Sequence, residues 1–166
     1  MQNAKDALNN LSYGVYVVSS FRGDEYGAGD EDDLEINAMT VRMVSQVCTR
    51  PPMLSLSVRK NSLTHEYICE SGVFALHVLA QGQELLAGHF GLRSGRQTPK
   101  FAALDYQRGE TGAPIFDQCR GWMECRLRAS HDMGTFVLII GEIVNVGCGV
   151  FNDKPTLVYR KSDYYG

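Results

Sequence analysis

The sequence predicts a mainly β domain of antiparallel strands with two or three short helices. Apolar and polar residues alternate in residues 54–59, where Leu54, Leu56 and Val58 share one face. A second alternating run covers residues 122–131, and a nearly continuous apolar run at 135–146 is typical of a central strand. Many strands with short connections favour a closed or nearly closed barrel, although composition alone does not separate a barrel from a sandwich.

The remaining elements follow from local pattern. Strands are expected at 13–21, 36–47, 53–58, 73–79, 122–131, 135–146 and 156–160, and helices at 3–11, 62–71 and 83–90. Pro51 and Pro52 separate two of the strands, and Gly72 suits the left-handed position that ends a helix. In 122–131, the alternation puts Glu124 on a solvent-facing side. A basic loop is expected at 91–100 and a turn at 109–114.

Length and composition favour a single domain over residues 1–166. The chain has 166 residues and 44% hydrophobic content, enough for a substantial core. No apolar run approaches the ~20 residues of a membrane helix, and the N-terminus lacks the apolar centre of a signal peptide, so a cytoplasmic protein is expected. The five cysteines form no CxxC pair, which argues against a zinc or dithiol site.

Charge is unevenly distributed along the chain. Residues 23–35 hold seven of the 19 acidic residues, which leaves 12 acids against 16 Lys and Arg elsewhere. This glycine- and acid-rich segment is expected to be a solvated hairpin loop. No basic stripe with interleaved aromatic residues is present, so nucleic-acid binding is not expected.

The most informative stretch is 37–70. It begins with the small and polar residues Asn37, Ala38, Met39 and Thr40 and continues through the alternating strand. Two cations, Arg59 and Lys60, then precede Asn61, Ser62 and Thr64 at a predicted helix start. Free N–H groups, hydroxyls and positive charge suit a phosphate, while helix capping is the simpler explanation for Asn61 or Ser62 alone.

The order of these motifs resembles the flavin reductase-like proteins with an FMN-binding split β-barrel. Further matching pieces are 61–66, 88–91, 94–96, 100–101, 109–114 and 141–144. The resemblance spans almost the whole chain and implies an antiparallel, Greek-key-like barrel.

The resemblance also implies a set of cofactor-binding residues for FMN. Asn37, Ala38, Met39 and Thr40 would meet the flavin ring and ribityl chain, and Gln46, Val47 and Cys48 would contact the ring edge. Arg59, Lys60, Asn61 and Thr64 would hold the 5′-phosphate. His89, Phe90, Lys100 and Phe101 would close the site, although core packing is an equal alternative for Phe90 and Phe101.

Phe136 departs from the family pattern. Members often have histidine at this position beside the flavin, and a phenyl ring can only pack where an imidazole could donate a hydrogen bond. Phe136 therefore puts the use of NADH or NADPH in question. No metal cluster or hydrolytic triad is present in the sequence, and flavin chemistry needs none.

The expected function is an FMN-dependent oxidoreductase. It would pass electrons or hydride from NAD(P)H or a redox donor to free flavin, ferric complexes or a redox protein. The alternative is an FMN-binding electron-transfer module without NAD(P)H turnover of its own. A homodimer is expected from the resemblance.

Overall fold

The computed structural model describes residues 3–23 and 35–160. Its elements, in chain order, are α1 (Ala4–Leu8), β1 (Tyr16–Phe21), β2 (Ile36–Val41), β3 (Val44–Thr49), β4 (Pro52–Arg59), α2 (Leu63–Ser71), β5 (Val73–Val78), α3 (Glu84–Gly91), β6 (Gln107–Arg108), β7 (Pro114–Ile115), β8 (Gly121–Asp132) and β9 (Phe136–Cys148). Most of the predicted acidic loop, residues 24–34, lies outside the described part.

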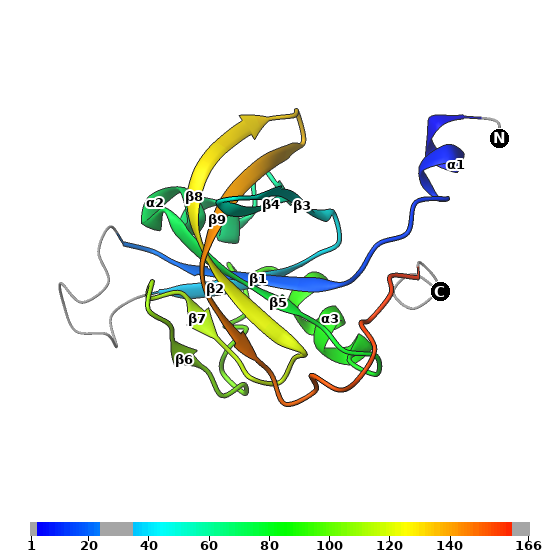
Figure 1. Ribbon diagram of the computed structural model, residues 1–166. Helices are drawn as coiled ribbons and strands as arrows, with labels where there is room; N and C mark the ends of the chain where they lie inside the picture. The colour runs from blue at the N-terminus through cyan, green and yellow to red at the C-terminus, as the bar shows by residue number, and fades with distance from the viewer. Residues whose placement is uncertain (1–2, 24–34, 161–166) are drawn as a thin grey trace.

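Seven strands form one antiparallel sheet in the order β2-β1-β5-β8-β9-β4-β3 (Figure 1). Its two edge strands, β2 and β3, are consecutive in the chain and are joined by only Arg42 and Met43. Two edges joined by so short a segment must approach each other there, so the sheet curls into a barrel. The predicted mainly β barrel is confirmed.

One predicted strand, 36–47, is wrong as a single element. β2 pairs with β1 as far as Val41, whereas β3 pairs with β4 from Val44 onward. The chain changes its pairing partner at Arg42–Met43, and no single strand can pair on both edges at once. Alternation cannot reveal this change because both halves are extended and partly apolar.

The alternation of residues 54–59 is confirmed. Leu54, Leu56 and Val58 are buried, whereas the serines between them are only partly so. β9 lies between β8 and β4, which confirms the central position expected for the apolar run. Ser62 caps α2 by accepting a hydrogen bond from the His65 N–H at 3.2 Å, and Gly72 ends the helix with a φ of 71°.

The solvent-facing side expected for β8 is wrong at Glu124, which is fully buried. The β6–β7 hairpin covers it. The Thr111 N–H and hydroxyl donate to its carboxylate at 2.8 and 2.6 Å, and the Asn145 side-chain amide does so at 2.7 Å. These bonds replace the water that the carboxylate loses, which makes its burial tolerable.

The predicted strand 156–160 is also wrong. The structure has only two isolated bridges there, Gly14 with Val158 and Ala80 with Thr156. The segment nevertheless runs beside the start of the chain, where the Tyr159 N–H donates to the Tyr13 carbonyl at 2.9 Å. It therefore holds the N-terminal segment in place without belonging to the sheet.

Both larger helices pack on β1 and β2, whereas α1 stands apart from the barrel (Figure 1). β1 is buried on both faces because Val18 packs inside the barrel and Val17 packs in a second cluster with α3. The start of α2 and the end of α3 consequently meet over β2. This junction positions the candidate site.

Candidate functional site

Two adjoining pockets lie where β2, α2 and α3 meet. The first has a volume of about 260 Å³ and the second about 110 Å³. Met39, Thr40 and Gly91 line both, so the two pockets adjoin and are together called the groove. Their combined size is in the range of roughly 300–1,000 Å³ typical of small-molecule sites.

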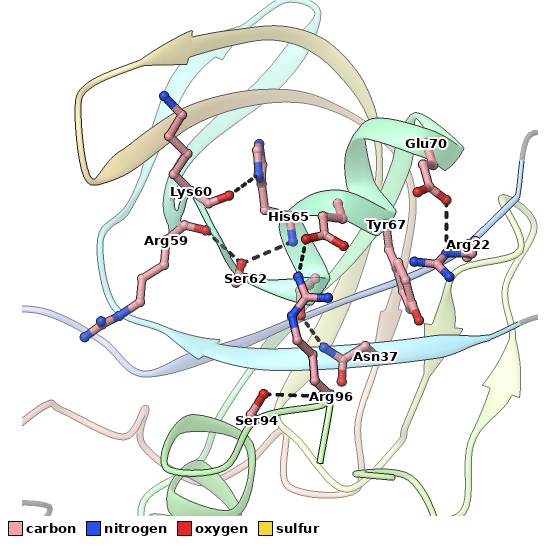
Figure 2. Close-up of polar contacts among 12 residues, drawn as sticks. Arg22, Asn37, Arg59, Lys60, Ser62, His65, Tyr67, Glu70, Ser94 and Arg96 are labelled. Carbon is pink, nitrogen blue, oxygen red and sulfur yellow. Dashed lines mark hydrogen bonds and ion pairs between the residues drawn. The ribbon is translucent and has the colours of Figure 1, made fainter. Parts of the chain in front are cut away.

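The second pocket contains the start of α2. Residues that the sequence predicted account for half of its lining: Asn37, Met39, Thr40, Asn61, Thr64, Phe90 and Lys100. The Ser62 side chain satisfies only the His65 N–H (Figure 2), which leaves the first-turn N–H groups of Leu63 and Thr64 without a partner among the described residues. Unpartnered N–H groups at a helix start favour an anion.

Cations reach this pocket from the loop after α3. Arg93 and Arg96 both line it. Arg96 is paired with Glu66 of α2, so it ties the loop to the helix. Arg93 forms no ion pair within residues 3–23 and 35–160 and is exposed. It is thus available to a bound anion.

Lys100 is a buried lysine with a structural task. Its Nζ donates to the carbonyls of Ala38 and Phe90, each at 2.9 Å, and so joins β2 to the end of α3. Burial lowers the pKa of Lys100 to about 8. A nearby phosphate would favour the ammonium form again, because opposite charges raise the pKa of a lysine.

The first pocket is larger, and more of its lining residues are apolar. It is lined by Val15, Met39, Thr40, Val41, Arg42, Met43, Ser57, Arg59, Ala87, Gly91, Leu92, Phe136 and Tyr159. Arg59 and Phe136 are paired residues of β4 and β9, so the phenyl ring and the guanidinium come from neighbouring strands. The lining mixes apolar and polar side chains, which suits an aromatic ligand that also carries polar groups.

The remaining predicted site residues line neither pocket. Gln46, Val47 and Cys48 belong to the edge strand β3, where Val47 is 51% exposed. The role expected for these three residues at the ring edge stays a prediction.

Lys60 and Arg59 point away from the start of α2 in Figure 2. The Lys60 ammonium is paired with Asp132, which holds it outside both pockets. His89 and Phe101 are likewise outside them: the His89 ring bonds to the Lys100 carbonyl at 2.7 Å, and Phe101 packs in the core.

Ala38 and Phe90 are buried in that same apolar cluster. Ala38 takes part in the site through its carbonyl oxygen, whereas Phe90 also lines the second pocket. Phe101 packs in the core and lines neither pocket, whereas Phe90 packs in the core and also lines the second pocket.

Sequence reasoning missed several lining residues. Arg93 and Arg96 lie in a loop whose basic character was recognised but not assigned to the phosphate end. Arg42 and Tyr159 of the first pocket carry no sequence signal, because an isolated arginine and a tyrosine near the chain end are ordinary surface residues.

The described residues contain no group of three or more side chains suited to hold a metal ion. All five cysteines lie in the described part and are free thiols. Across that part of the chain, every helix is too short or too polar to cross a membrane.

Comparison with known proteins assigns the family. The sequence model of the "Flavin reductase like domain" matches residues 8–166. The chain belongs to this family. The expected membership in the flavin reductase-like proteins is thereby confirmed.

Among the relatives of this family member, a high molecular weight rubredoxin of Moorella thermoacetica is 32% identical over 92% of the chain and 63% of the relative. A ferric-chelate reductase (NAD(P)H) of Archaeoglobus fulgidus is 28% identical over 96% of the chain and 88% of the relative. The chain thus spans less than two thirds of the rubredoxin's length.

A solved structure from Sinorhizobium meliloti 1021, called an oxidoreductase, superposes with a TM-score of 0.77 at 27% identity. The superposition includes 97% of the present chain and 51% of the chain in that structure. Such a superposition agrees with the barrel described above.

Proposed function

We propose that this flavin reductase family member binds FMN in the groove and acts as an NAD(P)H-dependent oxidoreductase. One observation carries the proposal: a small pocket with free helix N–H groups and cations adjoins a larger pocket with more apolar residues in its lining. A cofactor with a phosphate at one end and an aromatic ring at the other fits this arrangement. Leu63 and Thr64 N–H groups with Arg93 would hold the phosphate, and Met39, Thr40 and Phe136 would line the ring.

The flavin, when bound, supplies hydride and electron transfer. The protein's own contribution is to orient the ring between β2 and β9 and to neutralise the phosphate charge at α2. Electrons would come from NADH or NADPH and leave to free flavin, a ferric complex or a redox protein. The reductase activity of the relative from Archaeoglobus fulgidus supports this assignment.

A second candidate function is an FMN-binding electron-transfer module that does not use NAD(P)H itself. Phe136 supports it, because a phenyl ring in the first pocket offers no proton or charge to a nicotinamide. The likeness to a high molecular weight rubredoxin supports a redox-protein partner.

Anaerobic mixing separates these two functions. Purified protein, with its flavin identified by chromatography after acid extraction, is mixed with NADH and with NADPH, and absorbance of the oxidised flavin is followed. Rapid bleaching by either nucleotide supports the reductase. Bleaching only by dithionite or a reduced rubredoxin supports the electron-transfer module, and extraction of FAD in place of FMN contradicts the cofactor assignment.

The proposal includes a homodimer in the cytoplasm. Apolar side chains that stay exposed in one copy support it: Leu8 and Leu11 at α1 are 57% and 55% exposed, and Val146 of β9 is 64% exposed. Contact with a second copy would remove apolar area of these side chains from water. Light scattering of the FMN-loaded protein should give twice the 18.4 kDa chain mass, and a monomer with full flavin content contradicts this prediction.

A further inference from the structure

Arg42 lies at the first pocket against two aromatic rings. Its guanidinium carbon is 4.9 Å from the ring centroid of Tyr13 and 4.4 Å from that of Tyr159. Aromatic rings attract a cation through their electron-rich faces and do not use up its hydrogen bonds. Five N–H donors therefore stay available on Arg42.

The two tyrosines come from opposite ends of the chain. The Tyr159 N–H donates to the Tyr13 carbonyl at 2.9 Å, and the Val15 N–H donates to the Leu157 carbonyl at 2.9 Å. Arg42 itself is at the segment that joins β2 to β3, where the barrel closes. Three separate parts of the chain thus hold one exposed arginine in place, which reduces the entropy lost when it binds a ligand.

Charge at this pocket is of one sign. Arg59 is its other cation, and no Asp or Glu is among the lining residues. Neither Arg42 nor Arg59 forms an ion pair with any part of the chain that the structure describes. Two unneutralised arginines beside a cavity attract anions, and a guanidinium binds phosphate or carboxylate oxygens in pairs.

We propose that Arg42 binds an oxyanion of the diffusible second substrate, a phosphate of a nicotinamide nucleotide or a carboxylate of a ferric chelate. The flavin phosphate has a separate site in the second pocket, which Arg42 does not line. Arg42 therefore sets affinity for the molecule that exchanges electrons with the flavin. This inference depends on the proposed function because it assumes that the flavin ring occupies the first pocket.

The kinetic test uses Arg42→Gln, which keeps a polar side chain and removes the charge. Arg50→Gln is the matched control, because Arg50 is exposed, without an ion pair among the described residues, and outside both pockets. Loss of hydrogen bonds to a charged group should raise the KM for NADH about tenfold or more. The KM for 1-benzyl-1,4-dihydronicotinamide, an uncharged donor without phosphate, should not change.

A binding test does not require turnover. The FMN-loaded wild type and both variants are titrated calorimetrically with ADP-ribose and with citrate. Selective loss of ADP-ribose binding in Arg42→Gln identifies the nucleotide as the source of the anion, and selective loss of citrate binding identifies the chelate. Equal affinities in Arg42→Gln and wild type, or no binding of either anion to wild type, overturn the proposal.

The two proposals fail differently. If neither NADH nor the uncharged donor reduces the wild-type flavin, the reductase function is wrong, yet the titrations still decide the role of Arg42. If wild type is reduced by both donors and Arg42→Gln matches Arg50→Gln both in the kinetics and in the two titrations, the reductase function stands and the role of Arg42 is wrong.

Discussion

The side-chain amide of Asn37 donates a hydrogen bond of 2.9 Å to the hydroxyl oxygen of Thr64, and both residues are buried. The bond joins β2 to the first turn of α2. Because the Thr64 oxygen accepts from Asn37, its own proton can be donated elsewhere. Thr64 lines the second pocket, so that proton is available to a phosphate oxygen.

Thr64→Val tests this arrangement. The substitution keeps the shape of the side chain but leaves the buried Asn37 amide without its acceptor, at a cost of roughly 1–3 kcal/mol in the free energy of unfolding. It also removes a phosphate donor, so FMN affinity should fall about tenfold or more. Urea unfolding of the flavin-free protein and fluorescence titration with FMN measure the two effects. Thr64→Ser, the control, should retain most of the stability and most of the FMN affinity. Unaltered FMN affinity in Thr64→Val would refute the phosphate assignment.

Gly95 permits the loop after α3 to approach β2. A Cβ atom at Gly95 would lie 2.2 Å from the Asn37 side-chain oxygen, far inside van der Waals contact. Gly95→Ala should therefore displace Asn37 and weaken FMN binding at least several-fold. At Gly88 the nearest atom would be 3.8 Å away, and Gly88→Ala should leave FMN affinity intact while stabilising α3 by up to about 1 kcal/mol. Equal FMN affinities in the two variants would mean that the loop adjusts without disturbing the pocket.

Phe136 is predicted to set the choice of reductant. It lines the first pocket at the start of β9, next to Arg59 of β4. Phe136→His would introduce a group that can donate a hydrogen bond or carry charge, so it should raise the rate of flavin reduction by NADH or NADPH without a large change in FMN affinity. If the phenyl ring only packs against the flavin, Phe136→Ala should instead loosen FMN and leave relative rates with different donors unaltered.

Anaerobic single-turnover mixing of wild type and both Phe136 variants measures these rates. A wild type that is already reduced as fast by a nicotinamide as Phe136→His contradicts the prediction. In that case the phenyl ring places no limit on nicotinamide use, and the electron-transfer alternative loses its main support.

His77 should make the fold sensitive to acid. It is fully buried and stacked on Phe116, with one ring nitrogen bonded to the Val17 carbonyl at 3.1 Å and the other to the Phe116 N–H at 3.3 Å. Burial lowers the pKa of His77 to about 4, from 6.5. Between these values the unfolded chain binds a proton and the folded chain does not, so stability is full above pH 6.5 and falls toward pH 4.

The loss attributable to His77 should reach about 3 kcal/mol. Urea unfolding at pH 7 and pH 4.5 measures it in wild type and in His77→Gln, which can both donate and accept but does not titrate. The variant should be less stable at pH 7 and show a smaller further loss at pH 4.5. Parallel losses in both proteins would assign the acid sensitivity to other groups.

Local pattern predicted much of the fold. The alternation at Leu54, Leu56 and Val58 depends only on which face of a strand is buried, and the cap at Ser62 and the left-handed Gly72 depend on neighbours within one turn. The sequence by itself also determined the family, through the order of motifs along the whole chain, as the family comparison confirms. These features need no knowledge of distant contacts.

Tertiary structure alone decided where the chain changes pairing partner and which charges stay free. Arg42 is at the barrel closure because β2 and β3 pair on opposite edges, and it meets Tyr13 and Tyr159 because the segments before β1 and after β9 run side by side there. Lys60 and Arg93 look alike in sequence, but Asp132 neutralises Lys60 while Arg93 stays available beside α2. Ion pairing and pocket lining depend on distances between residues far apart in the chain, which periodicity does not encode.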